Sequence, residues 1–107
     1  MALTKDFQAT VRGRAVRDRA FRRALLREAV DSLLAGDVPT GKIVLRDYIN
    51  ATLGFAKLAE KTEIPTKSLM RMFSKDGNPQ AENLFEVILA LQHEEGVTLS
   101  TTLHAAR

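Results

Sequence analysis

The chain has 107 residues, of which 45% are hydrophobic and 27% are charged, and this balance is typical of one folded globular domain. It contains no cysteine, which excludes disulfide and thiolate chemistry. No stretch is apolar enough to cross a bilayer and the N-terminus lacks the apolar region of a signal peptide, so we expect a cytoplasmic protein without membrane contacts.

The net charge of +3 is unevenly distributed. Residues 1–35 carry eight Lys or Arg against four Asp or Glu, whereas residues 36–107 carry eight against nine. Seven arginines lie between Arg12 and Arg27, where Asp18 is the one acidic residue. A basic segment of this kind attracts polyanions, nucleic acid first and acidic membranes or proteins second.

Two helices are predicted in the arginine-rich region. The first spans about Lys5–Arg12, and Gly13 weakens its end. The second spans Arg19–Ala35, with Asp18 as its N-cap and Gly36 as its stop. Its apolar residues recur at helical spacing and form a broad inward face: Phe21, Leu25, Leu26, Ala29, Val30, Leu33 and Leu34.

Two shorter helices follow. The third is predicted over about Gly41–Ala51, capped by Thr40 and broken by Gly54. Its inward residues are expected to be Leu45, Tyr48 and Ile49. A fourth helix, over about Phe55–Lys61, precedes a bend.

The last part of the chain is predicted to hold two more helices around a turn. The fifth helix spans about Thr66–Ser74, and Lys75–Pro79 forms the turn because glycine and asparagine tolerate a positive φ. The sixth helix spans about Ala81–Glu94 and ends at Gly96. Its expected buried residues are Leu84, Phe85, Val87, Ile88 and Leu91. Val97–Leu103 is predicted to be a short strand or a loose tail.

The fourth and fifth helices fit a compact two-helix unit. Leu58 packs inward, small Ala59 allows close approach of the helices, and Ile64 points from the turn into the core. Leu69 and Met72 then anchor the fifth helix, with Phe73 adding to the same side. The opposite face carries no acidic residue, and its members are Thr66, Lys67, Met70, Arg71, Ser74 and Lys75.

A helix presented in this way fits the major groove of B-DNA, which is about 12 Å wide. Arg71 can pair bidentately with guanine, and Lys67 can do so less rigidly. Thr66 can form hydrogen bonds to a base edge or contact a thymine methyl group. The alternative is an amphipathic surface helix whose basic residues are merely solvated. Spacing alone leaves both interpretations open.

The stretch "GFAKLAEKTEIPTKSLMRMF" resembles the phage-repressor (Xre-type) helix-turn-helix family. The pattern positions are occupied by Leu58, Ala59, Ile64, Ser68 and Leu69. The following "DGNPQAENLFEVILAL", with its Gly-Asn-Pro turn, and the earlier "LLAGDV" are similar to the antidote proteins of bacterial addiction modules. The resemblance covers roughly residues 18–99.

The resemblance implies an all-helical DNA-binding domain that acts as a transcriptional regulator, usually a dimeric repressor on a palindromic operator. The family's base-reading positions fall on Thr66, Lys67 and Arg71. Ser68 is a predicted phosphate contact, as are Lys57, Lys75 and Asn78. Antidote proteins of this kind also bind and neutralise a toxin encoded beside them, and they regulate their own operon.

Two positions depart from the family pattern. Glu63 stands where the tight turn usually has glycine. Either Glu63 adopts left-handed geometry, which costs a non-glycine residue about 1–2 kcal/mol, or the turn takes another form. Phe55 stands where a polar residue often clamps a phosphate, and Lys57 is the nearest residue able to replace it.

Three interpretations of the arginine-rich segment remain open. It is an amphipathic packing helix with a solvated basic face, or a second DNA contact, or a membrane-surface helix. The second interpretation places Arg14, Arg17, Arg19, Arg22 and Arg23 along backbone phosphates, with Arg19, Arg22 and Arg23 as the principal contacts. The third is disfavoured because Asp18, Glu28 and Asp31 interrupt the charge.

Taken together, the sequence predicts an all-α compact helical bundle with a repressor-like helix-turn-helix and extra N-terminal helices. Its segments are residues 1–37 (arginine-rich helices), 38–96 (DNA-binding core) and 97–107 (strand or tail). We expect double-stranded DNA and a second copy as partners, with a toxin protein as the alternative partner. We expect no enzymatic activity, cofactor or metal, since His93 and His104 lack ligand spacing.

Overall fold

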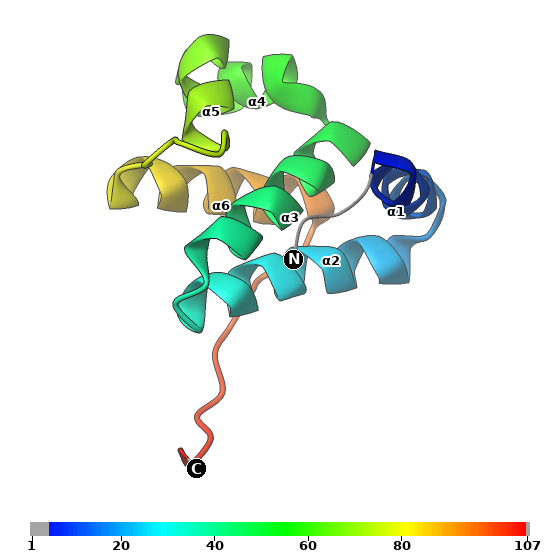
Figure 1. Cartoon of the computed structure of the whole chain (residues 1–107), viewed down its shortest axis with the longest axis vertical. Helices are drawn as coiled ribbons and strands as arrows, with labels where there is room; N and C mark the ends of the chain where they lie inside the picture. The colour runs from blue at the N-terminus through cyan, green and yellow to red at the C-terminus, as the bar shows by residue number, and fades with distance from the viewer. Residues whose placement is uncertain (1–4, 107) are drawn as a thin grey trace.

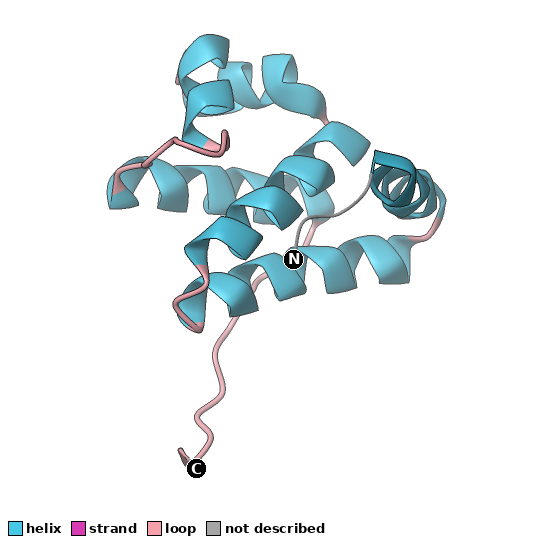
Figure 2. Ribbon diagram, in the orientation of Figure 1, coloured by secondary structure: helices cyan, strands magenta, loops and turns pink. Residues whose placement is uncertain are grey.

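The computed structural model describes residues 5–106, which form six α-helices and no strand (Figures 1 and 2). The helices are α1 (Lys5–Arg17), α2 (Arg19–Leu34), α3 (Val38–Ala51), α4 (Gly54–Thr62), α5 (Thr66–Met72) and α6 (Ala81–Glu95). The all-α prediction is therefore confirmed for the described residues. None of these six helices has both the length and the apolar composition needed to cross a membrane.

The first helix is longer than predicted. It runs through Gly13 and ends at Arg17, although glycine inside a helix costs about 1 kcal/mol relative to alanine. Packing explains the difference, because α1 contacts both α2 and α3 and buries Ala15 completely. Tertiary contacts therefore outweigh the local preference to end at the glycine.

Aspartates cap the next two helices. Asp18 accepts a hydrogen bond from the backbone N–H of Phe21 at 3.1 Å, which confirms the predicted start of α2. The predicted start of α3 was wrong, because Asp37 rather than Thr40 is the cap. Asp37 accepts from the backbone N–H of Thr40 at 3.3 Å, and Pro39 fits the first turn, where its missing N–H has no partner to lose.

A close approach joins α2 to α3. Gly41 lies against α2, and a Cβ atom built there would be 2.6 Å from Cδ2 of Leu33 and 3.2 Å from the carbonyl oxygen of Ala29. The absence of a side chain at residue 41 thus sets the distance between the two helices. This contact ties the arginine-rich N-terminal region to the rest of the bundle.

One core cluster draws side chains from α2 to α6 and the residues between them. Its largest fully buried members include Tyr48, Phe73 and Leu26. The predicted inward faces of α3 and α6 are largely confirmed, with Leu45, Ile49, Val87, Ile88 and Leu91 buried. Phe85 was predicted to be buried and is instead 64% exposed, because it borders an open groove beside α2 and the C-terminal segment.

The segment after α6 forms no strand. Val97 and Leu99 pack against the core cluster, and the backbone N–H of Leu99 donates to Oε1 of Gln92 at 2.7 Å. Residues 100–106 are exposed, and the chain leaves the helices there (Figure 1). Of the two predicted alternatives, a short strand or a loose tail, the strand is excluded, since residues 97–106 have no neighbouring strand with which to pair.

The two-helix unit and the arginine-rich helix α2 lie apart in the fold. Helices α4 and α5 lie together at one end of the bundle, and α2 lies at the other (Figure 1). Helices α3 and α6 occupy the space between them. A ligand that contacts α5 therefore meets a different side of the molecule from one that contacts α2.

Candidate nucleic-acid interface

The turn between α4 and α5 keeps the left-handed geometry despite lacking glycine. Glu63 has φ 60° and ψ 20°, and it is the one non-glycine residue with positive φ among residues 5–106. Its N–H donates to the carbonyl oxygen of Ala59 at 2.8 Å, which closes α4. Thr62 adds a second lock, since its Oγ1 donates to Leu58 and accepts from the N–H of Ile64.

Replacing Glu63 with glycine is expected to stabilise the fold. The left-handed conformation costs glutamate about 1–2 kcal/mol, and the greater unfolded-state entropy of glycine offsets part of the gain. We predict that Glu63→Gly raises the free energy of unfolding by about 0.5–1 kcal/mol, measured by urea denaturation. Glu60→Gly, at an exposed helical position of α4, is the matched control and should lower it by about 1 kcal/mol. Equal destabilisation by both variants would contradict the strain at Glu63.

One side of α5 is fixed in the core. Leu69 is fully buried, and Met72 and Phe73 are nearly so, as predicted. Phe73 packs beside Phe55 of α4, with ring centroids 6.1 Å apart. Phe55 is therefore a packing residue of the two-helix unit. The helix ends at Met72 rather than Ser74, because Ser74 turns its Oγ back to the carbonyl oxygen of Arg71 at 2.7 Å.

The other side of α5 carries unpaired positive charge. Lys67 and Arg71 are exposed on α5, and Lys75 is exposed just beyond the end of the helix. Met70 of α5 is 54% exposed. The ion pairs found within residues 5–106 include none of the three basic side chains. Thr66 is half-buried at the start of the helix. These charges are thus available to an anionic ligand.

The Gly-Asn-Pro turn packs directly against the C-terminal end of α5. A Cβ atom at Gly77 would lie 1.9 Å from the carbonyl oxygen of Arg71 and 2.9 Å from that of Met72. The reason for glycine is therefore close backbone approach and not the positive φ that we had predicted for this turn. Lys42 of α3, a buried lysine, donates from Nζ to the carbonyl oxygen of Gly77 at 2.5 Å. The turn is thus held on both sides.

This packing brings three predicted site residues together. Ser68, Arg71 and Asn78 line one open pocket of about 380 Å³ between α5 and the segment that leads into α6. Its other lining residues are Ile64, Met72, Pro79, Gln80 and Asn83. Lys57 is not part of this group, because it lines a separate pocket beside Tyr48 and Glu95.

The predicted phosphate contacts on α2 lie elsewhere. Arg22 forms a bidentate ion pair with Glu95, from Nε to Oε1 at 2.7 Å and from Nη2 to Oε2 at 3.0 Å. Arg23 adds a longer pair to Oε2 at 3.6 Å. Arg19 is exposed, but α2 is separated from α5 by α3 and α6 (Figure 1). The structure thus does not join these three arginines to the α5 face.

The Glu95 cluster is a buried polar site that sequence reasoning missed. Tyr48 donates its hydroxyl to Oε1 of Glu95 at 2.5 Å. Burial acts to raise the pKa of Glu95, but hydrogen bonds from Arg22 and Tyr48 outweigh it and leave that pKa below its ordinary value. Burial, with the hydrogen bond to Glu95, raises the pKa of Tyr48 well above its ordinary value. Spacing offered a signal, because Glu95 follows Leu91 by four residues on the buried side of α6.

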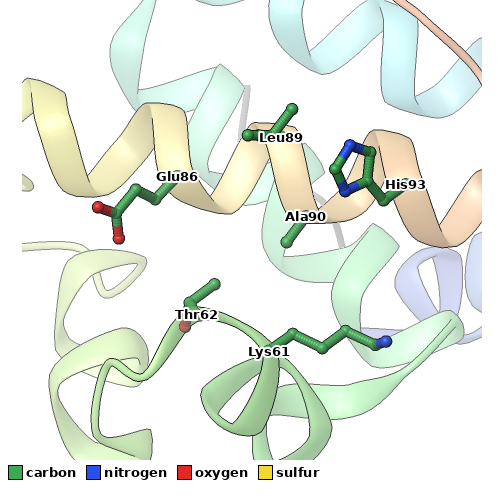
Figure 3. A pocket seen from close by; sticks show the side chains of 6 residues that line it. All are labelled: Lys61, Thr62, Glu86, Leu89, Ala90 and His93. Atoms are coloured by element: carbon green, nitrogen blue, oxygen red, sulfur yellow. The ribbon is translucent and has the colours of Figure 1, made fainter.

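A third open pocket lies between the end of α4 and α6 (Figure 3). Its lining residues are Lys61, Thr62, Glu86, Leu89, Ala90 and His93. Lys61 pairs with Glu94 across this gap, Nζ to Oε2 at 3.2 Å. Among residues 5–106 no group of three or more His, Asp or Glu side chains is placed to hold a metal ion. The Lys61–Glu94 pair thus joins α4 to α6 beside this pocket.

Comparisons with protein-family models, with curated proteins and with solved structures return no match to this chain.

Proposed function

We propose that this protein is a sequence-specific double-stranded DNA-binding regulator that inserts α5 into the major groove. One observation carries the proposal, namely that the exposed Lys67 and Arg71 of α5, and Lys75 just beyond its end, make no ion pair in the described structure. The buried Leu69, together with Met72, holds the exposed face of α5 outward. A rigid basic helix of this kind suits the groove geometry of helix-turn-helix proteins.

The side chains around this face divide into two roles. Arg71 and Lys67, one helical turn apart, would form hydrogen bonds with guanine edges, and Thr66 would contact the adjacent base. Ser68 and Asn78, which share a pocket with Arg71, would bind the phosphates on one flank of the groove. Lys75 adds a third phosphate contact. Phosphate contacts set the register of the helix, and base contacts set the sequence that it prefers.

A charge-reversal experiment tests which basic surface binds DNA. We expect Lys67→Glu with Arg71→Glu to abolish binding, because two attractive charges in the groove become repulsive. The matched control is Arg17→Glu with Arg19→Glu, at the end of α1 and the start of α2, which changes the net charge by the same amount at two exposed positions. That variant should retain most of the affinity in fluorescence anisotropy at fixed salt. Loss of binding in the control variant alone would mean that the arginine-rich segment, and not α5, binds DNA.

We also propose that two copies act together. One short helix contacts few base pairs, and a two-fold pair sets two reading helices about 34 Å apart. An open groove of about 720 Å³ lies between α2, α6 and the C-terminal segment, and it is bordered by Leu34 and Phe85, which are 68% and 64% exposed. Arg27 of α2 lies on one side of the groove, and Glu82 of α6 lies one turn before Phe85.

Phe85→Asp is therefore expected to disrupt the dimer. A charge in the centre of an apolar contact is left desolvated, so we predict at least a tenfold weaker association in sedimentation-velocity experiments. Val16→Asp on α1 is the matched control, because Val16 is 60% exposed and lies outside this groove. This groove would not be the dimer contact if Phe85→Asp associated as strongly as the parent protein. The same would follow if the parent protein were monomeric at micromolar concentration.

A second candidate function is that of an antidote protein that binds and neutralises a toxin. The position of α2 supports it, because the exposed Arg19 and Arg23 lie away from α5 and outside the proposed dimer groove, so a protein partner could bind there while DNA is bound (Figure 1). Co-expression with the adjacent open reading frame and purification of a tight heterocomplex would test it. A stable lone protein whose gene has no small neighbouring toxin gene would exclude this function. The two functions are compatible, since one protein can bind a toxin and repress its own operon.

A further inference from the structure

We infer that Met70 is a specificity-determining residue that reads the C5-methyl group of a thymine. This inference rests on the proposed function, and it extends the base-reading set beyond Thr66, Lys67 and Arg71. Met70 is an exposed apolar residue on the polar face of α5. Leu69 and Met72 are buried at 0% and 8% exposure, whereas Met70 is 54% exposed on a face that is otherwise polar.

The helical position of Met70 places it within the reading face. It follows Lys67 by three residues and Thr66 by four, so the three side chains are neighbours on the surface of α5. The opposite flank of the same face carries Ser68, which faces the pocket shared with Arg71 and Asn78. Two of the proposed phosphate contacts, Ser68 and Asn78, thus lie on one flank, and Met70 lies with Thr66 on the other.

The chemistry of the groove then limits what Met70 can contact. A thioether side chain offers no hydrogen-bond donor. Against a polar base edge it would displace water without replacing the hydrogen bonds that the water makes to the base. The thymine methyl group is the one apolar group that a base pair presents in the major groove. Methionine is flexible and polarisable, which suits contact with a small methyl surface. A thymine opposite Met70 is therefore favoured over the other bases.

The side chain of Met70 does not pack in the hydrophobic core. Met70 belongs neither to the core cluster nor to the partly buried residues packed against it. It also lines none of the pockets described above. Its substitution should leave the fold intact, and its effect can therefore be measured on DNA affinity.

A cycle of protein and DNA changes tests the inference. An operator is first selected with the parent protein from random double-stranded DNA. Each thymine of the half-site is then replaced in turn by deoxyuridine, which removes the C5-methyl group and leaves the base-pairing edge unchanged. Dissociation constants are measured by fluorescence anisotropy for the parent protein and for Met70→Ala, Met70→Leu and Thr66→Ala.

We expect one thymine whose replacement raises the dissociation constant of the parent protein about four-fold, which corresponds to the loss of one buried methyl group. Met70→Ala should be insensitive to that replacement, while Met70→Leu should remain sensitive because it keeps an apolar side chain. Equal sensitivity of Met70→Ala and the parent protein at every thymine would overturn the inference. So would loss of sensitivity in Thr66→Ala alone. Failure of the parent protein to enrich any sequence would instead overturn the proposed function itself, and the inference with it.

Discussion

Arg71→Ala is expected to weaken binding to the selected operator by about 1–3 kcal/mol, from several-fold to more than a hundredfold. The physical reason is the loss of a bidentate contact to guanine, which no neighbouring side chain can replace. Specificity should relax at a single base-pair position in each half-site. Measurement of the dissociation constant on all four variants of that base pair would reveal the change.

Lys75→Ala provides the control for this prediction. Lys75 is exposed beyond the end of α5 and is proposed to contact a phosphate. Its loss should therefore lower the affinity for all DNA sequences by the same factor. The slope of log affinity against log salt should also fall by about 1. If Arg71→Ala likewise weakened every sequence by the same factor, Arg71 would be a phosphate contact and not a base reader.

Glu95→Ala is expected to cause the largest loss of stability, about 2–3 kcal/mol. The substitution leaves the guanidinium of Arg22 and the buried hydroxyl of Tyr48 without their carboxylate partner. The estimate is below the full value for a buried pair because Arg22 keeps 22% exposure and water can solvate it. Glu94→Ala is the matched control, since its pair with Lys61 is partly exposed and worth less than about 1 kcal/mol.

The Glu95 carboxylate is also expected to make the free energy of unfolding fall in acid. The pKa of Glu95 is lower in the folded protein than its ordinary value of 4.5, so the unfolded state binds more protons below that pH. The stabilisation is fully present above about pH 4.5 and is lost as the pH falls through the folded pKa. Urea denaturation at a series of pH values should show a shallower acid decline for Glu95→Gln. Parallel curves for the variant and the parent protein would contradict this assignment.

Local patterns predicted most of the helices and the two-helix unit. The spacing of Leu58, Leu69 and Met72 specified which side of α4 and α5 is buried, because helical periodicity depends on near neighbours in the chain. The sequence left open whether Glu63 adopts a left-handed conformation or the turn takes another form, and the structure shows the left-handed conformation. The predicted division of α5 into a buried and an exposed side is therefore confirmed. Its contact with DNA stays a prediction.

Features that depend on distant residues were missed. Arg22 and Glu95 are 73 positions apart, and nothing local distinguishes a surface arginine from one that reaches across the bundle. The role of Gly77 depends on how the turn packs against α5, and that of Lys42 depends on the same turn. The separation of α2 from α5 likewise required the three-dimensional arrangement.

Selection of binding sequences from a random double-stranded DNA library tests the central claim most directly. The purified protein is incubated with the library at physiological salt, and bound sequences are amplified and sequenced through several rounds. We predict enrichment of a palindromic motif with half-site centres one helical turn apart and a fixed guanine in each half-site. Arg71→Ala should lose the preference for that guanine. Binding without enrichment of any motif would contradict sequence-specific reading by α5.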